Sequence, residues 1–351
     1  VWDCEAVSAG GAVHVQDNGI LVMEDSTLES NKAKFGGAVS AKLAAESFTL
    51  TIGSSTGSNT KTVSITVAEQ VTITCPTVVN RNNWLTDGAS LYLDTFAITI
   101  VGNQITARRS DKDADWGMNL EFQCTRKASR AKIILKVGTT SYVKGNTATV
   151  NGGGFYLRDR DTNLDVWGKD TKLVVEGNAA TVKGGGLAAV NAAVITVSTG
   201  AQMNVTKNTA NNYAGGFYLG SAGTRLKVVG KDTKLFMVEN IAKTKDGGGG
   251  WLNYGPVFSI SSGATVACEK NSAGSMGGCL LVQTSELDIK GADTKFLVGD
   301  NTGNWGGGLA FSIQASATVS DSAVVKIARN SALYGGGIFS RDQSSIKVSG
   351  S

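Results

Sequence analysis

Residues 175–185 read Val-Glu-Gly-Asn-Ala-Ala-Thr-Val-Lys-Gly-Gly, and this pattern decides the fold. An apolar residue, two spacers and an asparagine are followed, after four to seven intervening residues, by a pair of glycines. The pattern occurs eight times, and from the second copy onward successive asparagines lie 29–32 residues apart. Such a fixed period is the signature of a repeat architecture in which each unit packs on the next. The repeated asparagines are Asn31, Asn146, Asn178, Asn208, Asn240, Asn271, Asn301 and Asn330.

Short alternating segments separate the turns, such as Leu-Asp-Val at 164–166 and Leu-Lys-Val at 226–228. Alternation with β-branched residues predicts strands. Together with the period, it predicts an all-β fold, a right-handed parallel β-helix of coils of about 30 residues. Glycine and asparagine tolerate the left-handed backbone that the corners of coils need. We expect the repeated asparagines to stack as a structural ladder in which each amide bonds the next.

Every second coil carries a longer turn, Gly-Lys-Asp-Thr-Lys at 168–172 and 230–234 and Gly-Ala-Asp-Thr-Lys at 291–295. These turns would stack about 10 Å apart, because neighbouring strands are about 4.8 Å apart. Ordinary turn chemistry explains the Asp and Thr of the motif. The alternative is a basic ladder that contacts anionic glycans or a neighbouring subunit. Its members would be Lys169, Lys172, Lys231, Lys234 and Lys295.

The repeat resembles that of the polymorphic outer membrane proteins of chlamydiae, which carry many copies of Phe-x-x-Asn followed by Gly-Gly-Ala-(Ile/Leu/Val). This chain has Gly-Gly-Ala-Val at 10–13 and 36–39 and Gly-Gly-Gly variants later. It departs from the family at the Phe position, which is aliphatic, Met or Cys here. Similar repeats occur in large surface proteins of protists and algae. The resemblance covers 1–42 and 139–351, and it implies a surface-displayed β-helix used in adhesion or as a stalk, without enzymatic activity.

The repeat is interrupted between its first two asparagines. Residues 45–133 contain no Asn…Gly-Gly unit but do contain seven short strand-like runs with turn signals such as Asp87-Gly88. We therefore predict an antiparallel β-sandwich-like domain inserted between first coils at 1–44 and a main β-helix at 134–351. An elaborated, irregular pair of coils is the alternative.

Five cysteines point to an oxidising compartment. Cys75 and Cys124 each end a predicted strand of the insert, and we predict a disulfide that joins its two sheets. Two small buried thiols are the alternative. Cys268 and Cys279 could also pair, and Cys4 is left over.

Little in the sequence indicates catalysis or a cofactor. The single histidine, His14, lacks a nucleophile-elbow motif nearby, no Cys-x-x-Cys or His-x-x-x-His spacing favours zinc, and we assign no catalytic, cofactor or metal residue. The acidic stretch 111–115 leaves Ca²⁺ open as a weak alternative. A net charge of +4 without Lys/Arg runs argues against nucleic acid, and no apolar run is long enough for a membrane span. The sequence Asn204-Val205-Thr206 is a candidate glycosylation site.

An outward-facing apolar stripe is the most informative expected surface feature. In the strand after each Gly-Gly corner the first residue should point inward and the second outward. An exposed stripe of this size marks an interface with another subunit or a platform for sugar, unless a loop or the insert covers it. The stripe residues would be Tyr156, Ala188, Tyr218, Leu252, Leu281, Ala310 and Phe339.

Neither end of the sequence resembles the polar cap of a repeat protein, which predicts a segment of a longer β-helix or a unit that self-associates end to end or laterally. Our functional prediction is a non-enzymatic structural or adhesive rod in an extracellular surface fibre, stalk or layer. Surface glycans are possible partners, and no nucleic acid or membrane insertion is expected. The alternative is a carbohydrate-binding or polysaccharide-degrading β-helix module.

Overall fold

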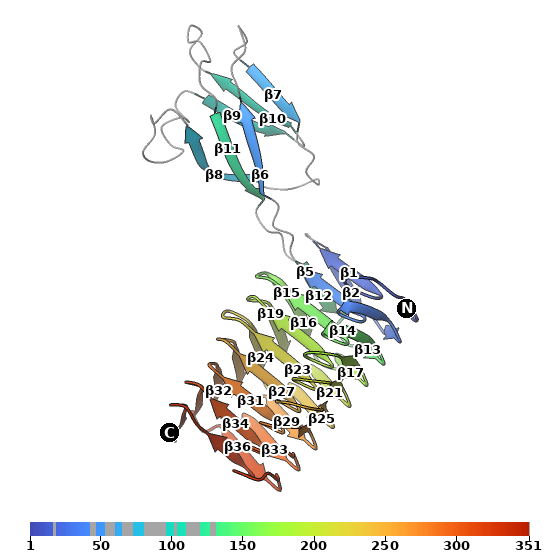
Figure 1. Ribbon diagram of the computed structural model, residues 1–351, viewed down its shortest axis with the longest axis vertical. Helices are drawn as coiled ribbons and strands as arrows, with labels where there is room; N and C mark the ends of the chain where they lie inside the picture. Colours follow the sequence, from blue (N-terminus) through green and yellow to red (C-terminus); the bar gives the residue numbers. More distant parts are fainter. Residues whose placement is uncertain are drawn as a thin grey trace. The chain divides into compact units, whose positions relative to one another are not determined.

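The computed structural model (Figure 1) describes residues 1–16, 19–42 and 131–350, with the strand backbones 47–52, 60–64, 73–80, 96–101, 104–109 and 120–126. The chain divides into two compact units, Val1–Leu43 with Arg130–Ser351, and Ala44–Ser129. The first unit is a parallel β-solenoid of about seven turns with coils of about 31 residues. The predicted parallel β-helix is therefore confirmed, and no helix occurs in the described part of the chain.

A typical coil contributes one strand to each of four parallel sheets, numbered here in the order in which the chain visits them. Sheet 1 contains β2 (Ile20–Met23), β12 (Ala131–Leu135), β16 (Thr162–Trp167), β20 (Val194–Ser198), β24 (Arg225–Val229), β28 (Val257–Ser261), β32 (Glu286–Lys290), β35 (Ser316–Ser320) and β38 (Ser345–Val348). Sheet 2 contains β3 (Thr27–Glu29), β13 (Thr140–Lys144), β17 (Lys172–Glu176), β21 (Gln202–Thr206), β25 (Lys234–Val238), β29 (Thr265–Glu269), β33 (Lys295–Gly299) and β36 (Val324–Ala328).

The other two sheets complete the coil. Sheet 3 is made of short strands, namely β4 (Lys32–Phe35), β14 (Thr147–Asn151), β18 (Ala179–Ala180), β22 (Thr209–Ala210), β26 (Ile241–Ala242) and β30 (Ser272–Ala273). Sheet 4 contains β1 (Val13–Gln16), β5 (Val39–Lys42), β15 (Phe155–Arg158), β19 (Leu187–Val190), β23 (Phe217–Gly220), β27 (Gly250–Asn253), β31 (Leu280–Gln283), β34 (Leu309–Ser312) and β37 (Ile338–Ser340).

The core lies inside the solenoid, and the alternation of the strands builds it. On β16 the residues Leu164 and Val166 are fully buried while Asp165 between them faces outward. The parallel register then places like on like, so that Leu164 lies beside Ile195 of the next coil and Ile195 beside Leu226. Each such side chain contributes roughly 1.5–3 kcal/mol when it leaves water, so the core grows coil by coil.

The corner between sheets 2 and 3 is a residue in the left-handed conformation that directly precedes each ladder asparagine. Its φ is 63° at Gly177, 55° at Lys207 and 58° at Glu239. A residue other than glycine in this conformation costs about 1–2 kcal/mol, which the packed coil has to offset. The asparagines themselves are not the left-handed residues; their role is hydrogen bonding.

The glycine pairs let neighbouring coils approach each other closely. A Cβ atom on Gly185 would lie 2.4 Å from the carbonyl oxygens of Gly215 and Thr209, both in the next coil. No side chain fits at that distance, so the second glycine of the pair is required by close backbone approach.

The second unit has two antiparallel three-stranded sheets. The first has the order β6 (Ser47–Ile52), β11 (Leu120–Arg126), β8 (Ile73–Asn80), and the second has the order β7 (Thr60–Ser64), β10 (Gln104–Arg109), β9 (Phe96–Val101). Six of the seven strand-like runs of the sequence overlap these strands, and the seventh, 91–93, lies outside the described residues. The solenoid resumes at β12, which begins at Ala131 and pairs with β2 and β16, so the boundary at 133/134 expected from the sequence is a few residues too late.

Candidate functional site

The repeated asparagines form one hydrogen-bonded column along the corner between sheets 2 and 3. The side-chain amide of Asn178 donates to Oδ1 of Asn208 at 3.0 Å, and the backbone N–H of Asn178 donates to the same oxygen at 2.9 Å. Its second amide proton goes to the carbonyl of Val143 in the preceding coil at 2.9 Å. The side-chain and backbone links to the next asparagine recur from Asn31 to Asn330. Because the buried amides are fully engaged within the protein, the ladder is a structural device that leaves no free donor for a ligand.

The cysteines fall into three groups. Cys268 and Cys279 form a disulfide across the solenoid interior, with Cα atoms 5.8 Å apart and both residues fully buried. Cys4 is a free, partly buried thiol. Cys75 and Cys124 lie on β8 and β11, which are neighbours in one sheet, with a register irregularity between Gln123 and Thr125. A bond between Cys75 and Cys124 would therefore lie within one sheet rather than join two, and their side chains are outside the described residues.

The expected apolar stripe is present as a column on sheet 4, but it is not exposed. Tyr156 and Tyr218 are 8% and 6% exposed, Leu281 is 2% exposed, and Ala188 and Ala310 are fully buried. Phe339 is partly buried at the last position of the column. The expectation of an exposed interface on this column is therefore wrong, because the stripe residues form a second, smaller core.

The stripe is covered by the segment that precedes each Gly-Gly corner. Met276 and Tyr213 from these segments belong to the same apolar cluster, and the Tyr213 ring stacks on Trp251 at 4.5 Å between centroids. Lys183 closes over the cluster with its Nζ 4.6 Å from the Tyr218 ring centroid and 5.3 Å from that of Trp251. Sequence reasoning treated these segments as spacers, although an aromatic residue or methionine just before the glycines signals the cover.

Leu252 is the one stripe residue assigned to the wrong face. The register pairs Tyr218 with Trp251, so Trp251 occupies the stripe and Leu252 points into the main core. The inward position before it is held by Gly250, where a Cβ would lie 2.6 Å from the Phe217 ring. The cause is one additional residue between Asn240 and the corner, which displaces the strand by one position.

The candidate glycosylation residue Asn204 lies on the outward face of β21. It is partly buried, and its Oδ1 accepts a hydrogen bond from Nε2 of Gln202 at 2.8 Å.

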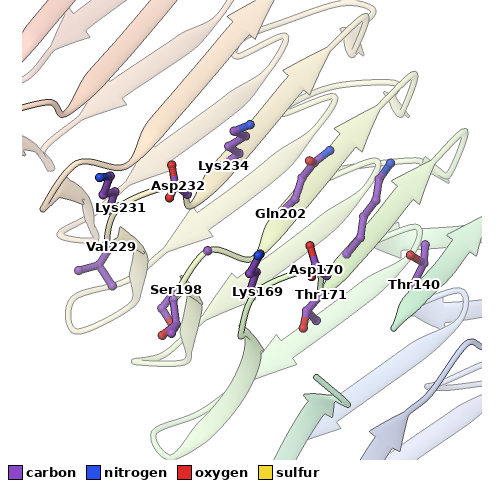
Figure 2. Close-up of a pocket in the computed structure, with 14 residues that line it drawn as sticks. Thr140, Lys169, Asp170, Thr171, Ser198, Gln202, Val229, Lys231, Asp232 and Lys234 are labelled. Carbon is purple, nitrogen blue, oxygen red and sulfur yellow. The ribbon is translucent and has the colours of Figure 1, made fainter. Parts of the chain in front are cut away.

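A groove of about 940 Å³ lies at the corner between sheets 1 and 2. It is built by two of the long turns, which place Lys169, Asp170, Lys231 and Asp232 around it, with Gln202 from the intervening coil (Figure 2). Lys172 and Lys234, the last residues of the two motifs, begin the strands of sheet 2 that form one wall.

The threonine of each long turn fastens two coils together. Thr233 is buried; its hydroxyl donates to the carbonyl of Val229 at 3.1 Å and accepts the backbone N–H of Gly200 in the preceding coil at 3.0 Å. Thr171 accepts from Gly138 and Thr294 from Gly263 in the same way. Each long turn therefore caps the short turn before it, which explains why the motif appears in every second coil.

Several lysines of the described solenoid form ion pairs, but those of the groove do not. Lys144 and Lys207 are paired with Glu29 and Glu176 at 3.3 Å. Within the described chain, none of Lys169, Lys172, Lys231 and Lys234 forms an ion pair, so their charges are available to a ligand.

Two carboxyl groups have a pKa raised by burial, but they do not form a pair. Burial raises the pKa of Asp165, which lies on sheet 1, and Lys132 at 3.9 Å partly opposes the shift. Burial also raises the pKa of Asp246, and the backbone N–H of Met276 at 2.9 Å opposes that shift. Asp246 lies beside sheet 4, on a different face from Asp165, so the two cannot flank one glycosidic bond.

The remaining sequence candidates are not assembled into a site. His14 lies on β1 and its Nε2 is 3.2 Å from Oε1 of Gln16. Among the described residues no group of three or more His, Cys, Asp or Glu could hold a metal ion. The acidic stretch 111–115 lies outside them. No helix that could span a membrane was found in the part of the chain that the structure describes.

Comparison with known proteins adds no assignment. No protein-family model matches the sequence, and neither a curated protein nor a solved structure matches it significantly.

Proposed function

We propose that this chain is a structural and adhesive segment of an extracellular surface fibre, stalk or layer, and that it acts without catalysing a reaction. The observation that carries the proposal is the asparagine ladder, which links the coils by side-chain and backbone bonds from Asn31 to Asn330. A catalytic solenoid needs only a few adjacent coils to hold its reacting groups. Here the same bonds recur along the whole solenoid, as expected of an element that transmits load along its axis.

Two further observations support the extracellular placement. The buried disulfide between Cys268 and Cys279 is typical of proteins that mature in an oxidising environment. The resemblance of the glycine and asparagine pattern to that of surface-displayed β-helices points to the same location.

The groove between sheets 1 and 2 favours glycan binding as the adhesive activity. Unpaired lysines, the amide of Gln202 and the carboxylates of Asp170 and Asp232 line one continuous hollow, and these are the donors and acceptors that sugar hydroxyls and acid groups use. Polysaccharide cleavage has no comparable support, because the two burial-shifted carboxyls lie on different faces.

The test is immunogold labelling and negative-stain electron microscopy of native material, combined with thiol trapping before and after reduction. We expect gold on extracellular fibres or layers and Cys268 and Cys279 labelled only after reduction under denaturing conditions. An intracellular signal with both thiols labelled without reductant would contradict the proposal. Release of reducing ends from a polysaccharide by the purified chain would contradict its non-enzymatic part.

A further inference from the structure

We infer that the groove between sheets 1 and 2 binds an acidic polysaccharide that lies along the solenoid axis and presents one acid group to every second coil. The inference rests on the adhesive part of the proposed function and names its ligand class. It follows from the register of the lysines, their lack of ion-pair partners and the aromatic residues beside them.

The register of sheet 2 fixes the lysine spacing. Thr140 pairs with Lys172, Lys172 with Gln202, and Gln202 with Lys234. The column continues through Thr265 to Lys295. Cationic residues therefore alternate with neutral hydrogen-bonding residues, and successive lysines are about 10 Å apart because strands are spaced about 4.8 Å. An extended disaccharide has about the length of two coils, so a polymer with one acid group per disaccharide repeats in phase with this column.

The turns add a second row of charges next to the first. Lys169 and Lys231 lie on the turns immediately before the column, each followed by Asp170 or Asp232 (Figure 2). The sheet lysines and turn lysines together give each of the two long turns at the groove two cations for one anion. The carboxylates of Asp170 and Asp232 accept hydrogen bonds from the hydroxyls of sugar rings between the acid groups. A polymer with closely spaced charges does not offer such hydroxyls.

Exposed aromatic rings flank the groove. Trp167 is 46% exposed at the end of β16 and pairs with Ser198, a groove residue. On the other side Tyr142 is 40% exposed and lies two residues beyond Thr140 on the same face of β13. Apolar faces of sugar rings pack on such rings, so the groove offers both packing and charge.

Nucleic acid fits the same groove poorly. A nucleic acid strand carries a charge about every 3.4 Å along the helix axis, whereas the lysines recur about every 10 Å. Phosphates between the lysines would lie beside the intervening coil, which offers Gln202 but no cation to pair with. The spacing of the lysines and their alternation with neutral residues thus favour a polyanion of low charge density.

The test measures binding of the purified full chain to hyaluronan oligosaccharides, which carry one carboxylate per disaccharide, by isothermal titration calorimetry at low and moderate salt. Neutral cello-oligosaccharides and single-stranded DNA serve as comparison ligands. We expect a hyaluronan hexasaccharide to bind at least about tenfold more tightly than a disaccharide, because it engages several coils at once. We expect the affinity to fall with salt.

Three variants separate a spaced site from general attraction to positive charge. Lys172→Gln with Lys234→Gln should weaken hexasaccharide binding at least about tenfold, since two charge-assisted contacts are removed. Lys207→Gln with Lys270→Gln is the matched control, because these exposed lysines are also two coils apart and lie at the opposite corner of sheet 2. Lys172→Gln with Gln202→Lys keeps the net charge but moves one cation by one coil.

The expected outcome is wild-type binding by the control and loss of the hexasaccharide preference in the transposed variant. Equal weakening of both double variants, or unchanged binding by the transposed variant, would overturn the inference. Tighter binding of DNA than of hyaluronan would also overturn it. If the chain is detected on extracellular fibres by immunogold labelling but binds no glycan, this inference is rejected and the structural role still stands.

Discussion

The side-chain amide of Asn178 and its backbone N–H both donate to one oxygen, Oδ1 of Asn208, at 3.0 and 2.9 Å. This three-centre contact makes each asparagine the cap of the corner in the preceding coil. We therefore expect Asn208→Ala to leave both donors of Asn178 and the carbonyl of Val175 without partners. The free energy of unfolding in urea should fall by about 3 kcal/mol or more, since each buried unpaired group costs about 1–3 kcal/mol.

Asn204→Ala is the control for this change, because Asn204 lies four residues earlier in the same coil, on β21, but faces outward. We expect it to alter the free energy of unfolding by no more than about 0.5 kcal/mol. Equal effects of the two substitutions would contradict a stabilising role of the ladder.

Thr233→Val tests the fastening of two coils by the long turn. Valine keeps the shape but removes the acceptor of the Gly200 N–H, and we expect a loss of about 1–2 kcal/mol in unfolding free energy. Thr265→Val, on the outward face of sheet 2, should change it by less than about 0.5 kcal/mol. A Thr233 variant as stable as the wild type would show that the hydroxyl does not hold the turn.

Substitution of two glycines distinguishes the need for close packing from the need for a left-handed backbone. Gly185→Ala should destabilise by more than about 3 kcal/mol or abolish soluble expression, because its Cβ would overlap backbone atoms of the next coil. Gly177→Ala has open space but a φ of 63°, so it should cost about 1–2 kcal/mol. Chemical denaturation of both variants gives the comparison, and the reverse order of stability would contradict the packing described here.

The interior disulfide can be replaced by the residues that neighbouring coils use. The double variant Cys268→Val with Cys279→Gly places the residues found at the equivalent positions of an earlier coil, Val205 and Gly216. It removes the disulfide that closes a short loop between residues 268 and 279. We expect a loss of about 2–3 kcal/mol in thermal or urea unfolding. Because both cysteines are fully buried, a thiol reagent with reductant should label them in wild type only after denaturant is added, as read by mass spectrometry. Rapid labelling of the folded chain would contradict their burial.

Asp246 predicts a pH dependence of stability. Its pKa is raised by burial above the ordinary value of 3.8, so its contribution to stability is present below that value and is lost as the pH rises through the folded-state pKa. Asp246→Asn keeps an acceptor for the Met276 N–H and removes the charge. The melting temperature of this variant should therefore rise relative to wild type between about pH 4 and pH 7.

Asp300→Asn should have the opposite effect on the pH dependence of stability. Its hydrogen bonds to Arg329 lower the pKa of Asp300, so its contribution is present at neutral pH and lost on acidification. The variant should be slightly less stable than wild type at pH 7, and the difference should vanish toward pH 3. A parallel pH profile for the Asp246 and Asp300 variants would contradict the assigned burial of Asp246.

The periodicity of Asn and Gly-Gly was sufficient to predict the solenoid because parallel coils repeat the same local chemistry at each turn. It also placed all eight asparagines at one corner. The cover of the stripe could not be predicted, because alternation tells which side chains leave the core and not what packs on them. Tyr213 and Met276 lie in irregular segments whose path is set by tertiary packing.

The error at Leu252 has a different origin. A one-residue shift reverses the face of every side chain in a strand, and four consecutive glycines at 247–250 offered two possible registers. The spacing from the asparagine distinguishes the two registers. The left-handed Gly247 lies seven residues after Asn240, whereas Gly184 lies six residues after Asn178. The groove was foreseen only as a row of lysines, since its depth arises from two turns folding on either side of a shorter one.

The threonine that fastens each long turn to the preceding short one has an evolutionary consequence. Removal of a single coil would bring two long or two short turns together, and one glycine N–H or one threonine hydroxyl would lose its partner. Removal or duplication of two coils preserves every such bond. Relatives of this chain should therefore differ in length by multiples of 61–62 residues, the separation of Gly168, Gly230 and Gly291, and the gene should grow by duplication of that double unit.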